Sequence, residues 1–142
     1  MTTAVIDTNV VVSGLLWTGT SAEVIDGVLT GRVISYTSVP ILLELEDVLT
    51  RKKFAAKFAS IGRTPSDVVR LWQSTCRVVE PVSMKIAALR DPKDVMLVEC
   101  AVSARVEYLV SGDRDLQALD RYGNLHVISP ADFLSALSRE AK

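Results

Sequence analysis

Acidic side chains stand in this sequence where short apolar runs end. Asp7 closes the apolar run at residues 3–6, and Asp113 follows the run at residues 108–111 across a glycine. Carboxylates within a few ångström of one another repel and raise one another's pKa unless a cation lies between them. Oxygen ligands of this kind are the ones that Mg²⁺ prefers. If the fold brings the acids together, the sequence therefore predicts a divalent metal site.

Two helical segments supply further acids. In the segment that begins at Asp94, apolar residues 97, 98, 101 and 102 fall on one stripe. Asp94 lies near the centre of that stripe, so we expect its side chain to point inward. In the segment after Ser38, residues 41, 42, 45, 48 and 49 form the apolar stripe, with Glu44 and Glu46 flanking it on either side. Periodicity does not choose between these two glutamates.

Each acid also has a purely structural interpretation. Asp94 has the residue type that caps the start of a helix, and Asp7 the type that holds a turn after a strand. Asp113 and Asp115 fit a turn followed by the start of a helix, and Glu44 fits the solvent-exposed rim of one. Taken singly these interpretations suffice, but they do not explain why several acids would meet at one edge of the fold.

Strands and helices alternate along the chain. The expected strands cover residues 3–6, 32–36, 77–79, 107–111 and 126–129, and helices are expected from residues 20, 40, 64, 94 and 130. Residues 20–23 have the spacing of a capping box. Apolar strands that alternate with helices favour an α/β fold with a parallel sheet covered on both faces. Ligands of such sheets bind outside the carboxyl ends of the strands, where Asp7 and Asp113 would lie.

The length and composition favour one domain. The sequence has 142 residues without a linker or an internal repeat, so we expect a single domain at residues 1–142. With 49% hydrophobic residues and a mean hydropathy of +0.28, the chain is too apolar for disorder. It has no apolar stretch of the ~20 residues that a membrane span needs. No secretory leader is visible at the N-terminus, so we expect a cytoplasmic protein that contacts no membrane.

Cysteine and histidine offer little for catalysis. Cys76 and Cys100 form no C-x-x-C motif and lie far in sequence from the single histidine, His126. We therefore expect two reduced, buried thiols and a structural histidine at the start of a strand. The formal net charge of −1 gives no global attraction for nucleic acid. A nucleic-acid substrate would need a local basic patch or metal ions.

Local cations and aromatic residues carry two interpretations each. The basic run at residues 51–53, with Lys57 and Arg63, is more commonly a solvated helix end than a nucleic-acid patch. Trp17, expected in the loop after the first strand, would either stack an unpaired base or pack against apolar side chains. Trp72 is expected in a core or in a subunit interface. Three cations adjoin the candidate acids, where they would hold phosphate or lie in solvent: Arg90, Lys93 and Arg114.

Four segments, in this order along the chain, resemble the PIN domain (named for the PilT N-terminus), and specifically the VapC-like toxin ribonucleases of toxin–antitoxin pairs. They are "VIDTNVVVSGLL" at 5–16, "TSVPILLELEDVLTRKKF" at 37–54, "DPKDVMLVECAVSARVEYLVSGDRDL" at 91–116 and "VISPADFLSAL" at 127–137. The resemblance implies a three-layer α/β/α sandwich around a central parallel sheet, with the first strand at its centre. It also implies an acidic quartet that binds Mg²⁺ or Mn²⁺.

The resemblance assigns this quartet to four residues of the chain: Asp7, Glu44, Asp94 and Asp113. It favours Glu44 over Glu46, because Glu44 occupies the acid position of the second segment. The polar companions that it implies are Asn9, Ser111 and, as an auxiliary acid, Asp115. One departure is Val95, where similar proteins often carry a polar residue.

The activity implied is metal-dependent hydrolysis of RNA phosphodiester bonds, in which a metal ion activates water and no serine or histidine nucleophile is needed. The toxin resemblance implies a small antitoxin partner that covers the acidic edge and inserts an arginine or lysine there. The apolar helices around residues 41–49 and 68–72 favour a homodimer.

Two other functions fit parts of the sequence. A phosphatase of the haloacid-dehalogenase type also begins with an aspartate after a strand, but it needs a second aspartate where this chain has Asn9. The other alternative is a non-catalytic PIN-like binding module, although a binding role would not require four clustered acids.

Overall fold

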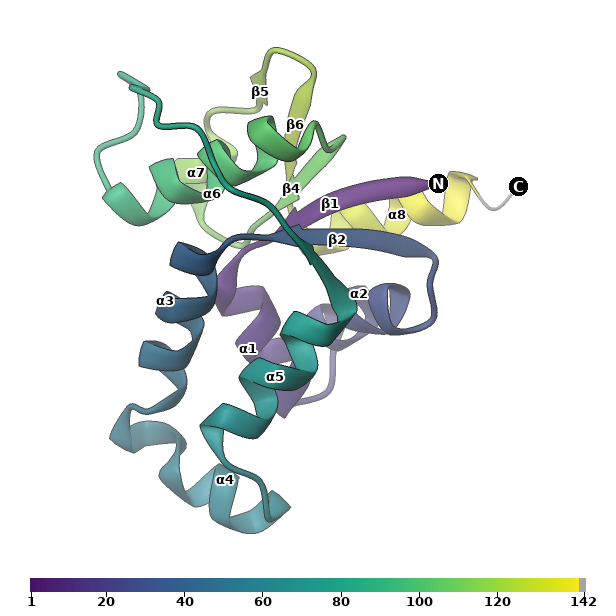
Figure 1. The fold of residues 1–142 in the computed structure, drawn as a ribbon. Coiled ribbons are helices and arrows are strands. Elements are labelled where there is room, and N and C mark those ends of the chain that lie inside the picture. Colours follow the sequence, from purple (N-terminus) through teal and green to yellow (C-terminus); the bar gives the residue numbers. More distant parts are fainter. Residues whose placement is uncertain (141–142) are drawn as a thin grey trace.

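A central sheet with helices on both faces forms the fold in the computed structural model, which describes residues 1–140 (Figure 1). The strand order is β3-β2-β1-β4-β6-β5. The strands are β1 (Thr2–Ile6), β2 (Val33–Thr37), β3 (Cys76–Val78), β4 (Tyr108–Val110), β5 (Arg121–Tyr122) and β6 (Leu125–Ile128). All neighbouring strands are parallel except β5 and β6. The α/β class and the central position of β1 are therefore confirmed.

The helices predicted from the sequence are all present, with small shifts in their bounds. They are α2 (Thr20–Leu29), α3 (Val39–Leu49), α5 (Pro65–Thr75), α6 (Pro92–Ala104) and α8 (Pro130–Glu140). The sequence reasoning missed several short elements: α1 (Thr8–Leu16), the 3-10 helix η1 (Lys52–Phe54), α4 (Ala55–Ile61), α7 (Arg114–Gln117) and the strand β5. Among residues 1–140, no helix is both long and apolar enough to cross a membrane.

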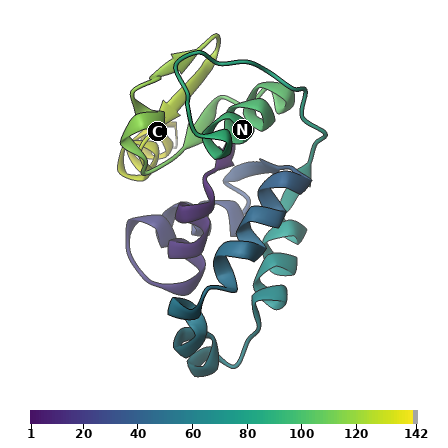
Figure 2. The same cartoon turned by 90° about the vertical axis from the view of Figure 1, so that its left-hand side faces the viewer.

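Two apolar cores, one on each face of the sheet, hold the three layers together. Along β1, Ala4 and Ile6 face the core formed with α1, α2, α3, α5 and α8, and Val5 faces the core formed with α6. This division follows from the alternation of side chains along a strand. Figure 2 shows α3 and α5 extending away from the sheet toward α4. The helices thus cover both faces of the sheet. They leave uncovered the edge that the carboxyl ends of the parallel strands form.

The start of α2 differs from the prediction. Residues 20–23 fit a capping box in sequence, but the N-cap is Gly19, at a φ of 123°, and no side chain caps the helix. The backbone closes the first turn instead, since the Glu23 amide donates to the Gly19 carbonyl at 3.1 Å. Side chains do cap two other helices: Ser38 caps the start of α3, and Thr64 caps the start of α5, where it forms a capping box with Asp67.

Four side chains test or refine the expectations for the core. Trp72 is only 1% exposed and packs in the core rather than at a surface. Its neighbour Leu71 lies on the outer flank of α5 and is 50% exposed, because the buried stripe of this helix runs through Val68, Val69 and Trp72. Cys100 is buried as expected, whereas Cys76, on an edge strand, is only half-buried.

The missed helix α1 begins directly after β1. Its run of three valines, at residues 10–12, has low helix propensity, which is why the sequence pattern favoured no helix there. Tertiary packing overrides that propensity, because all three valines are buried against the sheet and neighbouring helices. Gly14 lets α2 approach closely: a Cβ at this position would overlap the side chain of Ile25 and lie 2.6 Å from the Ser21 carbonyl oxygen.

Candidate functional site

The carboxyl ends of β1 and β4 place Asp7 and Ser111 side by side. The Ser111 hydroxyl donates a hydrogen bond of 2.6 Å to Oδ2 of Asp7. The Asp7 amide donates to the Val110 carbonyl at 2.9 Å, so the pairing of the two strands continues to their ends. Ser111 Oγ also accepts a bond of 3.0 Å from the Asp113 amide. One buried serine therefore fixes the positions of two of the predicted acids.

Asp7 has a second structural role, because it is the N-cap of α1. Its Oδ1 accepts from the Asn9 amide at 3.4 Å. Asp113 repeats this arrangement at the start of α7, where its carboxylate accepts from the Asp115 amide at 2.8 Å. The structural interpretations of these two acids are thus correct, and they are compatible with a role in the site, since a capping carboxylate keeps free lone pairs.

Asp94 lies in the first turn of α6 but does not cap it. The N-cap is Asp91, whose carboxylate accepts from the Lys93 amide at 2.9 Å. The prediction that the helix begins at Asp94 is therefore wrong by about one turn, because the Asp-Pro pair at 91–92 starts it earlier. Asp94 is left without a capping function, and its side chain is buried, at 8% exposure, on the inward stripe as predicted.

The structure distinguishes the two glutamates of α3. Glu44 is half-buried and points to the acidic edge, whereas Glu46 is exposed on the other side of the helix. Glu44 lies on the same face of α3 as Val48, four residues further along the helix, and Arg51, just beyond the end of α3, lines the same cavity. The Lys93 ammonium lies 3.8 Å from Oε1 of Glu44.

All four acids of the predicted quartet line one cavity of about 180 Å³. The lining residues are Asp7, Asn9, Glu44, Val48, Arg51, Asp91, Lys93, Asp94, Leu97 and Asp113. Five carboxylates thus face two cations. Asp115 does not reach this cavity; it lies with Asp91 and Asp94 at a neighbouring hollow. Ser111 does not line it either and acts through the hydrogen bonds that hold Asp7 and Asp113.

The crowding of carboxylates shows in their proton affinities. Burial, and then the charges of Asp113, Asp91, Asp7 and Asp115, raise the pKa of Asp94 to about 6. Burial also raises the pKa of Asp7, against the hydrogen bond from Ser111, which favours the ionised form. The pKa of Glu44 is raised by burial and lowered in part by Lys93. A divalent cation would offset both the burial of these carboxylates and the repulsion between them.

The donor set suits a hard cation that keeps most of its water. Among residues 1–140, no group of three or more histidine, cysteine, aspartate or glutamate side chains is placed so that it could hold a metal ion by itself. Mg²⁺ usually retains several waters and binds through one or two carboxylates together with substrate phosphate oxygens. An open cavity whose polar lining is mainly carboxylate oxygen therefore fits Mg²⁺ or Mn²⁺ better than a cation that needs a closed cage.

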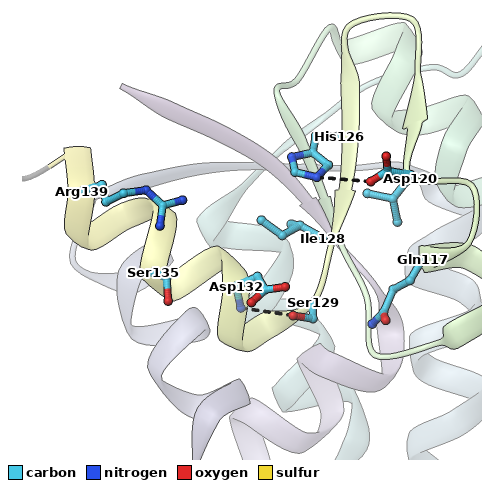
Figure 3. A pocket seen from close by; sticks show the side chains of 9 residues that line it. Gln117, Asp120, His126, Ile128, Ser129, Asp132, Ser135 and Arg139 are labelled. Carbon is cyan, nitrogen blue, oxygen red and sulfur yellow. Dashed lines mark hydrogen bonds and ion pairs between the residues drawn. The ribbon is translucent and has the colours of Figure 1, made fainter.

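A larger cavity, of about 460 Å³, lies beside β6 and α8 (Figure 3). There His126 Nε2 lies 3.7 Å from Asp120 Oδ1, and Ser129 Oγ accepts from the Asp132 amide at 3.1 Å. Unlike the smaller cavity, this one is not lined by the four predicted acids. We therefore place the candidate site at the smaller cavity, on its chemistry rather than its size.

Sequence reasoning missed two residues of the acidic cavity. Asp91 could have been found from the Asp-Pro pair, because proline favours the first position of a helix and aspartate the position before it. Helical periodicity could not have placed Arg51 there, because it lies beyond the end of α3, as the N-cap of η1.

Comparison with known proteins agrees with this fold. A sequence model described as PIN domain matches residues 3–115, a range that includes all four acids. The crystal structure of PAE2754 from Pyrobaculum aerophilum is similar over 97% of this chain and 96% of that chain, with a TM-score of 0.62 and 18% sequence identity. At this identity the likeness concerns the fold alone. No curated protein matches the sequence significantly.

Proposed function

The chain belongs to the PIN-domain family, and on that premise we propose that it is a metal-dependent endoribonuclease. PIN domains are typically nucleases and generally use divalent metal ions. The observation that carries the proposal is the convergence of Asp7, Glu44, Asp94 and Asp113 on one cavity at the carboxyl edge of the sheet.

The residues of the cavity divide into two roles. The four carboxylates would surround Mg²⁺ or Mn²⁺, with one or two of them bound to the ion directly and the others through its water. The bound ion would supply the Lewis acidity that activates water toward a phosphodiester. Ser111 holds the Asp7 carboxylate in place through its 2.6 Å hydrogen bond, which favours the ionised form against the effect of burial. Lys93 and Arg51 offset part of the negative charge and attract the phosphate of the substrate. Asn9 is a further polar group that lines the cavity. Asp115 would act as an auxiliary acid from the neighbouring hollow, which it lines together with Asp94.

A matched pair of glutamate variants tests the proposal. Glu44→Gln removes a carboxylate from the cavity, and Glu46→Gln removes one from the exposed side of the same helix. Purified proteins are incubated with structured and single-stranded RNAs in Mg²⁺, Mn²⁺ or EDTA. We expect cleavage that needs the metal, is lost in Glu44→Gln and Asp7→Asn, and persists in Glu46→Gln. Cleavage in EDTA, or equal cleavage by both glutamate variants, would refute the assignment.

We extend the proposal to a toxin that acts in the cytoplasm with a cognate antitoxin. The support is the sequence resemblance to toxin ribonucleases and an acidic cavity that is accessible to an inserted arginine or lysine. Expression alone should inhibit growth, and co-expression with a small protein encoded beside it should relieve that inhibition and yield a complex. Harmless expression without any binding neighbour would remove the toxin role and leave the nuclease proposal intact.

We also propose a homodimer. Val39 and Leu43 on α3 are 57% and 63% exposed, and Leu71 on the adjacent helix α5 is 50% exposed. A symmetric dimer buries the same face of both copies and would cover these side chains. Light scattering should give twice the chain mass for the native protein and a single chain mass for Leu43→Lys. A native protein that is monomeric at all concentrations would contradict the proposal.

A further inference from the structure

An aromatic and basic surface lies at the far end of α1 from Asp7. It consists of Trp17, Phe54, Lys53 and Lys57, which we call the Trp17 patch. The Trp17 and Phe54 rings lie 5.8 Å apart at an angle of 52°. The Lys57 ammonium lies 5.5 Å from the centre of the Trp17 ring, and the Lys53 ammonium lies 5.1 Å from that of Phe54.

Trp17 is held in place but not covered. Phe54 is only 8% exposed and joins the core, whereas the Trp17 side chain against it stays 45% exposed. The other tryptophan of the chain, Trp72, is 1% exposed. Phe54 and Lys57 therefore both lie against the Trp17 ring, which nonetheless remains partly in solvent. The sequence left open whether Trp17 stacks a base or packs, and the structure shows packing that still leaves ring surface available.

The two lysines of the patch have no acidic partners. Among the described residues, neither Lys53 nor Lys57 forms an ion pair, unlike Lys93 at the acidic cavity. An aromatic face flanked by unpaired cations is the combination that binds single-stranded nucleic acid, since bases stack on the ring and phosphates contact the cations. A duplex offers no unstacked base to such a surface.

Two elements connect the patch with the acidic cavity. Asp7 is the N-cap of α1 and Trp17 is its C-cap, so the ten steps between them span about 15 Å along the helix axis. Arg51, which lines the cavity, is the N-cap of η1, and Lys53 and Phe54 lie within η1. A strand stacked as in a duplex advances about 3.4 Å per nucleotide, so this span corresponds to about four nucleotides.

We propose that the Trp17 patch binds an unpaired segment of the RNA substrate, with one base stacked on Trp17 and backbone phosphates on Lys53 and Lys57. Arg51 would contact the RNA backbone between the patch and the acidic cavity. The inference rests on the proposed function for its substrate class, and it makes the enzyme selective for RNA that is single-stranded for about four nucleotides beside the cleaved bond.

Tryptophan fluorescence in EDTA tests binding apart from cleavage. The probe is a single-stranded 12-nucleotide oligouridine, and its duplex with oligoadenine is the comparison. We expect the single strand to quench the emission of Trp17 and the duplex to do so far more weakly. In Trp17→Phe the only remaining tryptophan is the buried Trp72, so the quenching should disappear while the emission of Trp72 reports an intact fold.

Affinity measurements on variants identify which side chains of the Trp17 patch bind RNA. By anisotropy with a labelled oligouridine, Trp17→Ala should bind about tenfold more weakly or worse, the loss typical of one stacked base. The double variant Lys53→Gln/Lys57→Gln should reduce the slope of log affinity against log salt by about 1.4, at about 0.7 per phosphate contact on a single strand. Lys85→Gln, an exposed lysine outside the patch, is the matched control and should leave that slope unchanged.

The outcomes separate this inference from the proposed function. Metal-dependent cleavage together with unchanged RNA affinity in Trp17→Ala overturns the inference and leaves the nuclease proposal standing. RNA binding that needs Trp17, without cleavage in any metal, supports the inference and refutes the nuclease. Equal binding of duplex and single strand, or binding of a partner protein but no RNA at the patch, overturns the inference.

Discussion

The Ser111 hydroxyl and the Asp7 carboxylate join the ends of two parallel strands by a 2.6 Å hydrogen bond between residues 104 positions apart. This bond lowers the pKa of Asp7, which burial raises. Ser111 also accepts a hydrogen bond from the Asp113 amide, so this one serine fixes the positions of both Asp7 and Asp113.

Ser111→Ala should therefore move the acidic limb of the pH–activity profile to higher pH. Without the hydrogen bond the pKa of Asp7 rises further, so a higher pH is needed to ionise it. Loss of a buried bond to a charged group should also lower the free energy of unfolding by about 1–3 kcal/mol. Ser129→Ala, which removes a similar hydroxyl near the start of α8, should leave the profile in place. A profile that is identical in the wild type and Ser111→Ala would contradict this role.

Asp94→Asn should lose activity and gain stability. The folded-state pKa of Asp94 is raised to about 6, above the ordinary value of 3.8, so the folded protein binds the proton more tightly than the unfolded chain does. The contribution of Asp94 to stability is therefore least favourable above pH 6 and improves as the pH falls toward 4. The amide removes this penalty, and metal-free Asp94→Asn should be more stable than the wild type by about 1–3 kcal/mol at pH 7.

Urea unfolding at pH 4 and pH 7 measures the effect, and the stability gain should shrink at pH 4. Cleavage of RNA by Asp94→Asn should fall by about 10²-fold or more, as for the loss of other preorganised electrostatic groups. Asp132→Asn, in the first turn of α8, is the matched control, because that aspartate is exposed and distant from the acidic cavity. Normal cleavage by Asp94→Asn would show that the acid has no part in the reaction.

Mg²⁺ should raise the melting temperature. The ion binds the folded acidic cavity and has no such site on the unfolded chain, so stabilisation follows mass action and reaches about 2.7 kcal/mol at 100 times the dissociation constant. Differential scanning calorimetry at pH 7 in EDTA and in millimolar Mg²⁺ measures it. The shift should be smaller in Asp94→Asn, and equal melting temperatures in both buffers would count against a metal site.

Gly14→Ala should destabilise the fold without touching the acids. The added methyl group would overlap Ile25 and lie 2.6 Å from the backbone oxygen of Ser21, so α1 and α2 must move apart. Overpacking of this kind costs about 1–3 kcal/mol in the free energy of unfolding. Gly112→Ala is the control, because a Cβ there meets nothing within 4 Å. Similar urea midpoints for both variants would show that the helices adjust freely.

The sequence pattern was most informative where burial and chemistry coincide. Apolar stripes predicted α3 and the inward position of Asp94 correctly, because a helical period of 3.6 residues is set by backbone geometry. The sequence pattern was least informative for α1, because valines disfavour a helix and only tertiary packing stabilises this one. Periodicity also left Glu44 and Glu46 equivalent, since the choice depends on which flank of α3 faces β1 and α6, and that is a long-range property.

Boundaries and charge partners were likewise beyond the sequence pattern. The one-turn error at α6 arose because both Asp91 and Asp94 have the residue type of an N-cap, and the proline at position 92 decides between them. The ion pair between Lys93 and Glu44 joins two helices far apart in the chain, so no local pattern could have predicted it.

The register of the central strands also determines when the acidic cavity can exist. β1 pairs with β4 through Ala4 and Tyr108, so the edge that carries Asp7 is completed by residues more than 100 positions later. Pairings of such high sequence separation form late, because the loop they close is long. During synthesis, a chain that has emerged only as far as Glu44 contains two of the four acids and the strands β1 and β2, but not β4 or the Ser111 and Asp113 that follow it. The acidic cavity is therefore incomplete in a growing chain until β4 and Asp113 have left the ribosome.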